Sequence, residues 1–208
     1  MIGIIEKVIV DCLLDIGGDE LRLDVFLDAG IPPERVYRID QHYPDAETAR
    51  LIASALRCTG LAEPELFRRL SVSFFDVVEH VFPEFLRMCR TSEELVRRQA
   101  KIHALIAAGS RRPGESEKST DKFAMESLGP HHVRVRYRSE LQLDGFFETL
   151  VREAAARFGD EVEIPPYARG GGGADGSMIT VKWTSIAGRP TRFADRRANP
   201  AERRAMHG

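Results

Sequence analysis

The first sixteen residues, MIGIIEKVIVDCLLDI, are apolar on nearly every side of the helix that their spacing predicts over residues 2–16. A helix of this kind has to be buried on more than one face, so the rest of the chain must supply several elements that pack around it. Charged residues interrupt the run, which is too short for a membrane span and lacks the basic start of a signal peptide. We therefore expect a core helix that ends at Gly17 and Gly18.

Three further long helices are predicted before residue 110. Asp45 stands at a start signal and Gly60 at a stop signal, and a helix with one apolar face then runs to Pro83, which kinks or ends it. Residues 91–110 form the last helix of this half, with an N-cap at Thr91 or Ser92. The first half of the chain is therefore expected to be helical.

On this last helix, His103 falls on the same face as Val96 and Ala107, so its ring is expected to point inward. A buried neutral imidazole needs a partner for each ring nitrogen, because an unpaired nitrogen costs about 1 kcal/mol or more. A metal ion on one nitrogen and a carbonyl oxygen on the other would satisfy both. A core histidine that hydrogen-bonds to a neighbour would satisfy them as well, and both interpretations stay open.

The second half of the chain alternates between strands and a helix. Two strands meet at a Leu-Gly-Pro turn, and in the second of them Tyr137, Ser139 and Leu141 share one face. An amphipathic helix over residues 144–158 follows, and EVEIPPYA and SMITVKWTSI read as further strands. The pattern predicts an α+β protein, in which a helical N-terminal lobe packs on a C-terminal lobe of antiparallel sheet and helices. Residues 187–208 are arginine-rich and are expected to be a disordered tail.

The composition narrows the class of protein. A chain of 208 residues with 43% hydrophobic residues suits one soluble domain, and a formal net charge of -2 gives no bias toward nucleic acid or membranes. Three scattered cysteines favour a reducing, cytoplasmic compartment, and Cys12 and Cys58 are expected to be small buried side chains. We find no nucleophile elbow, HExxH motif or P-loop, so we do not expect an enzyme.

Several short motifs occur in a recognisable order: Tyr43-Pro44-Asp45, then Thr59-Gly60, then Phe82-Pro83, then a helical histidine, and finally a strand with Tyr137 and Ser139. This order resembles the heme-nitric oxide/oxygen-binding (H-NOX) family of gas sensors, which also supplies the sensor of soluble guanylate cyclase. The resemblance covers residues 1–186 and implies a helical lobe over about 1–60 and a heme-cradling lobe over about 61–186. The family's strand motif is Tyr-x-Ser-x-Arg, and Leu141 stands here in place of the arginine.

The resemblance implies a site for heme b. His103 would be the axial ligand of the iron, and Tyr137 and Ser139 would bind the propionates. Phe146 falls where family members that hold oxygen stably carry a tyrosine, so the implied ligand is NO, with CO as a second candidate, and no stable O₂ complex. The wall on the gas side is expected to be apolar and to consist of Ile5, Ile9, Phe74, Val78, Phe146 and Leu150.

The resemblance also implies a bacterial sensor in which gas binding shifts the His103 helix and a separate partner reads the motion. The partner would be a histidine kinase or a cyclic-nucleotide enzyme, because the chain carries no output motif of its own. The competing hypothesis is an interaction module on the same scaffold that binds no heme or binds another ligand. Leu141 favours this alternative, because it removes a charge-assisted contact to a propionate.

Overall fold

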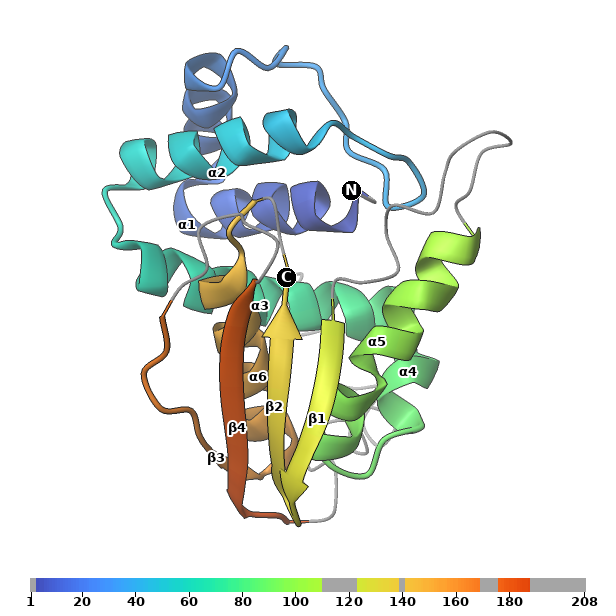
Figure 1. Ribbon diagram of the computed structural model, residues 1–208. Coiled ribbons are helices and arrows are strands. Elements are labelled where there is room, and N and C mark those ends of the chain that lie inside the picture. The colour runs from blue at the N-terminus through green and yellow to red at the C-terminus, as the bar shows by residue number, and fades with distance from the viewer. Residues whose placement is uncertain (1–2, 110–122, 139–140, 169–175, 188–208) are drawn as a thin grey trace, which may run out of the picture.

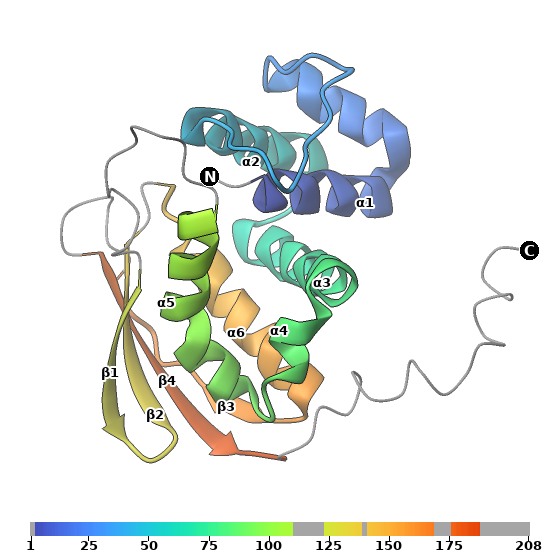
Figure 2. The same ribbon diagram turned by 90° about the vertical axis from the view of Figure 1, so that its right-hand side faces the viewer.

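The computed structural model describes residues 3–109, 123–138, 141–168 and 176–187 (Figures 1 and 2). The predicted tail over residues 187–208 lies outside these ranges except for Ala187. The helices are α1 (Ile4–Asp28), α2 (Asp45–Thr59), α3 (Glu63–Val81), α4 (Pro83–Arg87), α5 (Ser92–Gly109) and α6 (Asp144–Phe158). The strands are β1 (Phe123–Gly129), β2 (His132–Tyr137), β3 (Glu161–Glu163) and β4 (Ser177–Ser185).

The first helix bends at the glycine pair that the sequence predicted as its end. Gly17 and Gly18 both have non-helical backbone angles, and Gly18 has φ 69° and ψ −161°. Residues other than glycine rarely adopt these backbone angles. The segment after the bend turns back so that Val25 and Phe26 are fully buried, and α1 packs against α2 and α3.

Two predicted boundaries are confirmed. Gly60 takes the left-handed conformation, with φ 65°, and its amide donates to the carbonyl oxygen of Leu56 at the end of α2. Pro83 is the first residue of α4, where its missing N–H and fixed φ are tolerated, and it follows directly on the end of α3. These local signals therefore determine where α2 and α3 end.

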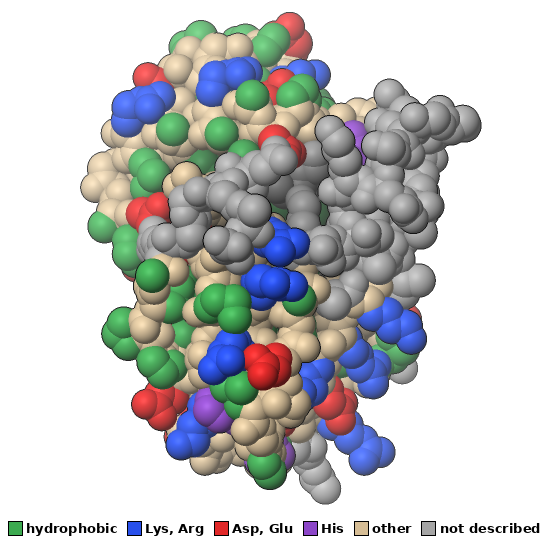
Figure 3. Space-filling view, viewed as in Figure 1, with side chains coloured by type: hydrophobic (Ala, Val, Ile, Leu, Met, Phe, Trp, Pro, Cys, Tyr) green, Lys and Arg blue, Asp and Glu red, His purple; other side chains and the backbone are tan. Residues whose placement is uncertain are grey.

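The four described strands form one antiparallel sheet in the order β1-β2-β4-β3, so the predicted α+β class is confirmed. Its inner face is apolar and fully or almost fully buried. The outer face carries the exposed Arg136 and Lys182 and the ion pair of Arg134 with Glu126, and Figure 3 shows lysine and arginine side chains over the strands. The inner face consists of Val133, Val135, Ile179, Val181 and Trp183.

Helix α6 takes part in three clusters of buried apolar side chains. Phe146 belongs to the first cluster, between α1, α2 and α3, and Phe147 belongs to the second, against the sheet. Phe158 belongs to the third, among α3, α4 and α5. Figure 2 shows α6 between α3 on one side and the sheet on the other. The helix therefore joins the helical part of the molecule to the sheet.

The two cysteines of the predicted helices behave differently. Cys12 is buried, as predicted, but Cys58 is exposed, so the prediction for that residue is wrong. Cys58 lies on the side of α2 that faces the acidic residues Asp24 and Asp28, and the adjacent Arg57 forms an ion pair with Asp28. The apolar spacing on α2 does not reveal that this side lacks a packing partner. None of the described helices combines the length and the apolar character needed to cross a membrane.

Candidate functional site

Phe146 and Phe74 form the centre of the predicted apolar wall. The ring of Phe146, which is only 4% exposed, lies 6.3 Å from that of Phe74 between centroids, with the planes at 86°. Phe67, on the same helix as Phe74, lies 5.8 Å from Phe146. Edge-to-face aromatic contacts of this kind stabilise one relative position of two helices. The wall is therefore built on a fixed contact between α3 and α6.

The other predicted wall residues meet the same apolar clusters. Ile9 on α1 is buried in the first cluster, and Ile5 and Leu150 pack against it. Val78 is instead buried in the third cluster, against which Leu150 and Phe74 also pack. The structure thus brings five of the six residues to one cluster and places Val78 at the adjoining one.

The hydroxyl groups of Ser71 and Thr149, beside this wall, already form hydrogen bonds within the protein. Ser71 Oγ donates to Thr149 Oγ1 at 2.7 Å, and Thr149 Oγ1 donates to the carbonyl oxygen of Phe146 at 2.9 Å. A hydroxyl group has one proton to donate, so these two protons are directed at protein acceptors. The wall that the described side chains form is therefore apolar, with hydroxyl groups that serve to hold α3 against α6.

The Cys12 thiol also lies in the first cluster, 2% exposed. Burial raises the pKa of Cys12 above its ordinary value, and a hydrogen bond with Ser73 opposes the rise. The group is therefore a neutral thiol at pH 7. It adds a small apolar side chain to the cluster.

Tyr137 ends β2 and packs against both the first and the second cluster. Its ring stacks on Phe147, with centroids 5.4 Å apart and planes at 16°, and lies 4.9 Å from that of Phe123. These contacts hold the ring where the sheet meets the helices. Tyr137 is thus half-buried at the boundary between an apolar interior and the surface, as a residue at the rim of a pocket would be.

Arg138 is a residue whose position the strand pattern does not predict. Alternation would place Arg136 and Arg138 on the side of the strand opposite Tyr137, and Arg136 is indeed exposed. Arg138 is half-buried, with its Nε atom buried, because β2 ends at Tyr137 and the alternation ends with it. A Cβ atom on Gly176, at φ +64°, would lie 2.7 Å from Arg138 Cγ, so only glycine permits this close approach.

The remaining predicted site residues are described only in part. Leu141 is half-buried and packs against the first cluster. Ser139 lies outside the described residues. His103 lies on α5, whose backbone is described to Gly109, but its side chain is outside the description.

The described residues fit a flat, apolar cofactor with acidic edges, as heme is. Apolar side chains from α1, α3 and α6 converge on one cluster, and Tyr137 packs against its edge. Arg138 adds a half-buried guanidinium group, which can pair with a carboxylate. This set of groups matches the needs of a porphyrin for an apolar wall and polar donors at the propionates.

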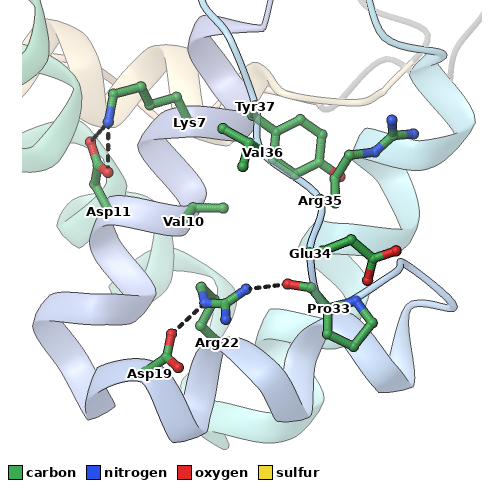
Figure 4. A pocket seen from close by; sticks show the side chains of 10 residues that line it. All are labelled: Lys7, Val10, Asp11, Asp19, Arg22, Pro33, Glu34, Arg35, Val36 and Tyr37. Atoms are coloured by element: carbon green, nitrogen blue, oxygen red, sulfur yellow. Dashed lines mark hydrogen bonds and ion pairs between the residues drawn. The ribbon is translucent and has the colours of Figure 1, made fainter.

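A separate cleft of about 350 Å³ lies in the N-terminal lobe, and none of the predicted site residues lines it. Figure 4 shows it between the two halves of α1 and the segment that follows. Two of its cations are paired, Lys7 with Asp11 at 2.9 Å and Arg22 with Asp19 at 2.7 Å. Each pair lies within one half of α1 and neutralises a cation at the cleft, and we assign no ligand to the cleft.

A family model and several solved structures match this chain. Residues 2–165 match the family model described as Haem-NO-binding. No curated protein sequence matches the chain. The matched range includes α1, α3, α5, β2 and α6, which are the elements that carry the predicted site residues.

Solved H-NOX structures share the fold at 17% sequence identity. An I5F mutant of T. tengcongensis H-NOX has a TM-score of 0.72, with 90% of this chain and 100% of that chain covered. An H-NOX protein from S. oneidensis in the Fe(II)NO ligation state has a TM-score of 0.73, with coverage of 89% and 100%. An oxygen-binding H-NOX domain related to soluble guanylate cyclases has a TM-score of 0.70, with coverage of 89% and 96%. Because the family model spans most of the chain, the protein belongs to the Haem-NO-binding family and has the H-NOX fold.

Proposed function

We propose that the protein is a heme-based sensor of NO that passes its signal to a separate protein. The observation that carries this proposal is the wall around Phe146, in which apolar side chains converge and the neighbouring hydroxyl groups are directed at protein acceptors. Membership in the Haem-NO-binding family supports it. CO is a second candidate ligand.

In this proposal each residue has one role. His103 on α5 would donate a ring nitrogen to the iron, and Tyr137, Ser139 and Arg138 would donate hydrogen bonds to the propionates. Bound heme b would supply a ferrous iron with one open position for a diatomic gas. Arg138 would provide the charge-assisted contact that Leu141 cannot, because it follows Tyr137 directly and is half-buried.

The choice of NO over O₂ depends on side chains and not on the fold. Structures described as an oxygen complex and as an Fe(II)NO state resemble this chain to nearly the same degree. Bound O₂ is strongly polar and needs a hydrogen-bond donor, whereas NO and CO need little such support. Phe146 has no donor, and the hydroxyl of Thr149 is directed at the Phe146 carbonyl oxygen. The wall therefore favours NO.

The signal would leave the site through α5. This helix packs on α6 and on β1, so a shift at His103 changes its contacts with the sheet and with the helices. The division into a helical lobe over about 1–60 and a heme-cradling lobe over about 61–186 is part of the same proposal. So are a cytoplasmic location and a histidine kinase or cyclic-nucleotide enzyme as the partner.

An absorption spectrum of the purified protein, reconstituted with hemin and reduced, tests the proposal. We expect a Soret band that shifts when NO is added and stays unchanged in air, apart from slow oxidation of the iron. The variant His103→Gly should lose the band or regain it only with added imidazole. The matched control is His80→Gly, because His80 is exposed near the end of α3 and should not affect heme.

A second candidate function is an interaction module that binds no heme. Leu141 favours it, because this apolar side chain packs against the first cluster at the position where the family carries an arginine. A protein that stays colourless after reconstitution with hemin, while remaining folded by circular dichroism, would support this candidate and overturn the heme sensor.

A further inference from the structure

The first turn of α5 is held by a buried group of polar residues from three elements. Asp160, just after the end of α6, accepts a hydrogen bond from the Ser92 amide at 2.8 Å and another from the Ser92 hydroxyl at 2.7 Å. The indole N–H of Trp183 on β4 donates to Ser92 Oγ at 2.8 Å. Ala187 donates its amide to the other oxygen of Asp160 at 3.0 Å. Figure 2 shows the first turn of α5, the end of α6 and β4 in the lower half of the view.

Every polar group in this cluster has a partner, although Ser92 is fully buried and Asp160 and Trp183 are 6% and 4% exposed. Hydrogen bonds to a buried carboxylate are about twice as strong as bonds between neutral groups. The carboxylate also lies at the N-terminus of a helix, where the helix dipole favours a negative charge. The cluster is therefore a strong attachment for one end of α5.

Apolar packing fixes the same turn from two sides. Leu95 is buried in the third cluster, against α6, and Val96 is buried in the second, against the sheet. His103 lies eleven residues beyond Ser92 on the same helix, which corresponds to about 16 Å along the axis. If the first turn stays fixed, a sideways shift of about 1 Å at position 103 therefore tilts the helix axis by only about 3–4°.

We propose that Asp160 is a positioning residue that acts through Ser92: it fixes the first turn of α5 as a pivot, so that a signal at His103 rotates the helix instead of sliding it along its axis. This inference rests on the proposed function, and it identifies the first turn of α5 as the end of the helix that does not move when NO binds. Trp183 completes the pivot by ordering the Ser92 hydroxyl, which donates to Asp160 and accepts from the indole.

Hydrogen exchange of the reduced holoprotein, with and without NO, tests the pivot. In the wild type we expect NO to change exchange of the α5 amides after Arg97 while the amides of Ser92 and Val96 stay protected. In Asp160→Asn we expect the amides of Ser92 and Val96 to exchange about tenfold faster or more, and the NO-dependent change to extend to them. Ser92→Ala, which keeps the backbone bond to Asp160, should give a smaller change of the same kind.

Thr91→Ala is the matched control, because Thr91 Oγ1 accepts from the Glu94 amide within the same turn and makes no bond to α6 or β4. It should weaken the cap without extending the NO-dependent change to Ser92. If NO changes exchange at Ser92 as much as beyond Arg97 in the wild type, the pivot is wrong and the sensor stands. If the wild type shows no Soret band, or a band that NO does not shift, the proposed function itself fails.

Discussion

The rings of Phe74 on α3 and Phe146 on α6 meet edge to face, with centroids 6.3 Å apart. The contact joins two helices that also share the hydrogen bond between Ser71 and Thr149 at 2.7 Å. Because both contacts hold α6 in place, the side chain at position 146 has a fixed direction. A substitution there should therefore change the chemistry of the wall more than its shape.

We expect Phe146→Tyr to stabilise an oxygen complex of the reduced holoprotein. The added hydroxyl group would supply a donor in the apolar wall, and a hydrogen bond to a charged acceptor is worth roughly 1.5–3 kcal/mol, which corresponds to at least a tenfold slower release of oxygen. The decay of the oxygen complex after rapid mixing with an oxygen scavenger, followed by absorption, would measure this release. Phe147→Tyr is the control, because Phe147 lies on the sheet side against Tyr137. If both variants released oxygen at the same rate, the proposed place of Phe146 in the wall on the gas side would be wrong.

We expect Leu141→Arg to slow the loss of heme. Leu141 is half-buried against the first cluster, at the position where the family motif carries an arginine, so the new guanidinium group would provide a charge-assisted contact to a propionate. Transfer of heme to an excess of apomyoglobin should slow by about tenfold. The control is Gln142→Arg, on the adjacent exposed residue. Faster loss of heme from Leu141→Arg would show that the position faces away from the propionates.

Arg157 is a buried cation that holds α6 to α3. Its guanidinium group lies 2.8 Å from Asp76 and 3.4 Å from Glu79, with Glu153 at 2.7 Å on its own helix. Arg157→Met should lower the free energy of unfolding by about 3–5 kcal/mol, because the half-buried Glu79 and Glu153 lose their counter-charge. Urea denaturation measures the loss. Arg152→Met, in an exposed pair with Glu148, should cost less than about 1 kcal/mol. Similar losses in both variants would contradict the special role of Arg157.

Glu6 makes stability depend on pH in a direction unusual for a carboxyl group. Burial raises its pKa above the ordinary 4.5, and a hydrogen bond from Thr48 only partly offsets the rise. The folded state therefore binds the proton more tightly than the unfolded state, and stability falls as the pH rises from 4.5 through the raised pKa. Glu6→Gln keeps an acceptor for Thr48 and carries no charge. Its melting temperature should exceed that of the wild type by roughly 2–4 °C at pH 8, with the difference vanishing near pH 4.

Glu65→Gln is the control of opposite sign. Hydrogen bonds from Arg68 and Arg69 lower the pKa of Glu65 to about 2, so its small contribution is present at neutral pH and lost in acid. This variant should be slightly less stable than the wild type at pH 8. A gain in stability at pH 8 for Glu65→Gln, or none for Glu6→Gln, would contradict the account of the buried carboxyl group.

The sequence predicts the parts of this fold that local signals determine. Gly60 and Pro83 mark helix boundaries correctly, and the buried Val133 and Val135 alternate with the exposed Arg136 in β2, as the period of a strand requires. These predictions succeed because backbone conformation and side-chain period are properties of a few neighbouring residues.

Other features depend on residues far apart in the chain and could not be predicted. Asp160 and Trp183 reach Ser92 across 68 and 91 residues, and no local pattern connects them. Arg157 looks like a surface residue at the end of an amphipathic helix, yet it is buried because α3 brings Asp76 beside it. Cys58 is the reverse case, because the helical spacing predicts a buried side chain, yet the side chain is exposed.

The bend at Gly18 decides how far the N-terminal lobe reaches. A straight helix of 25 residues would extend about 38 Å, and its second half would project into solvent with Phe26 uncovered. Because the helix bends, its second half packs into the same buried cluster as its first half, and Asp28 at its end forms an ion pair with Arg57 on α2. The bend at Gly17 and Gly18 thus converts what would be a protruding helix into a second packed side of the N-terminal lobe.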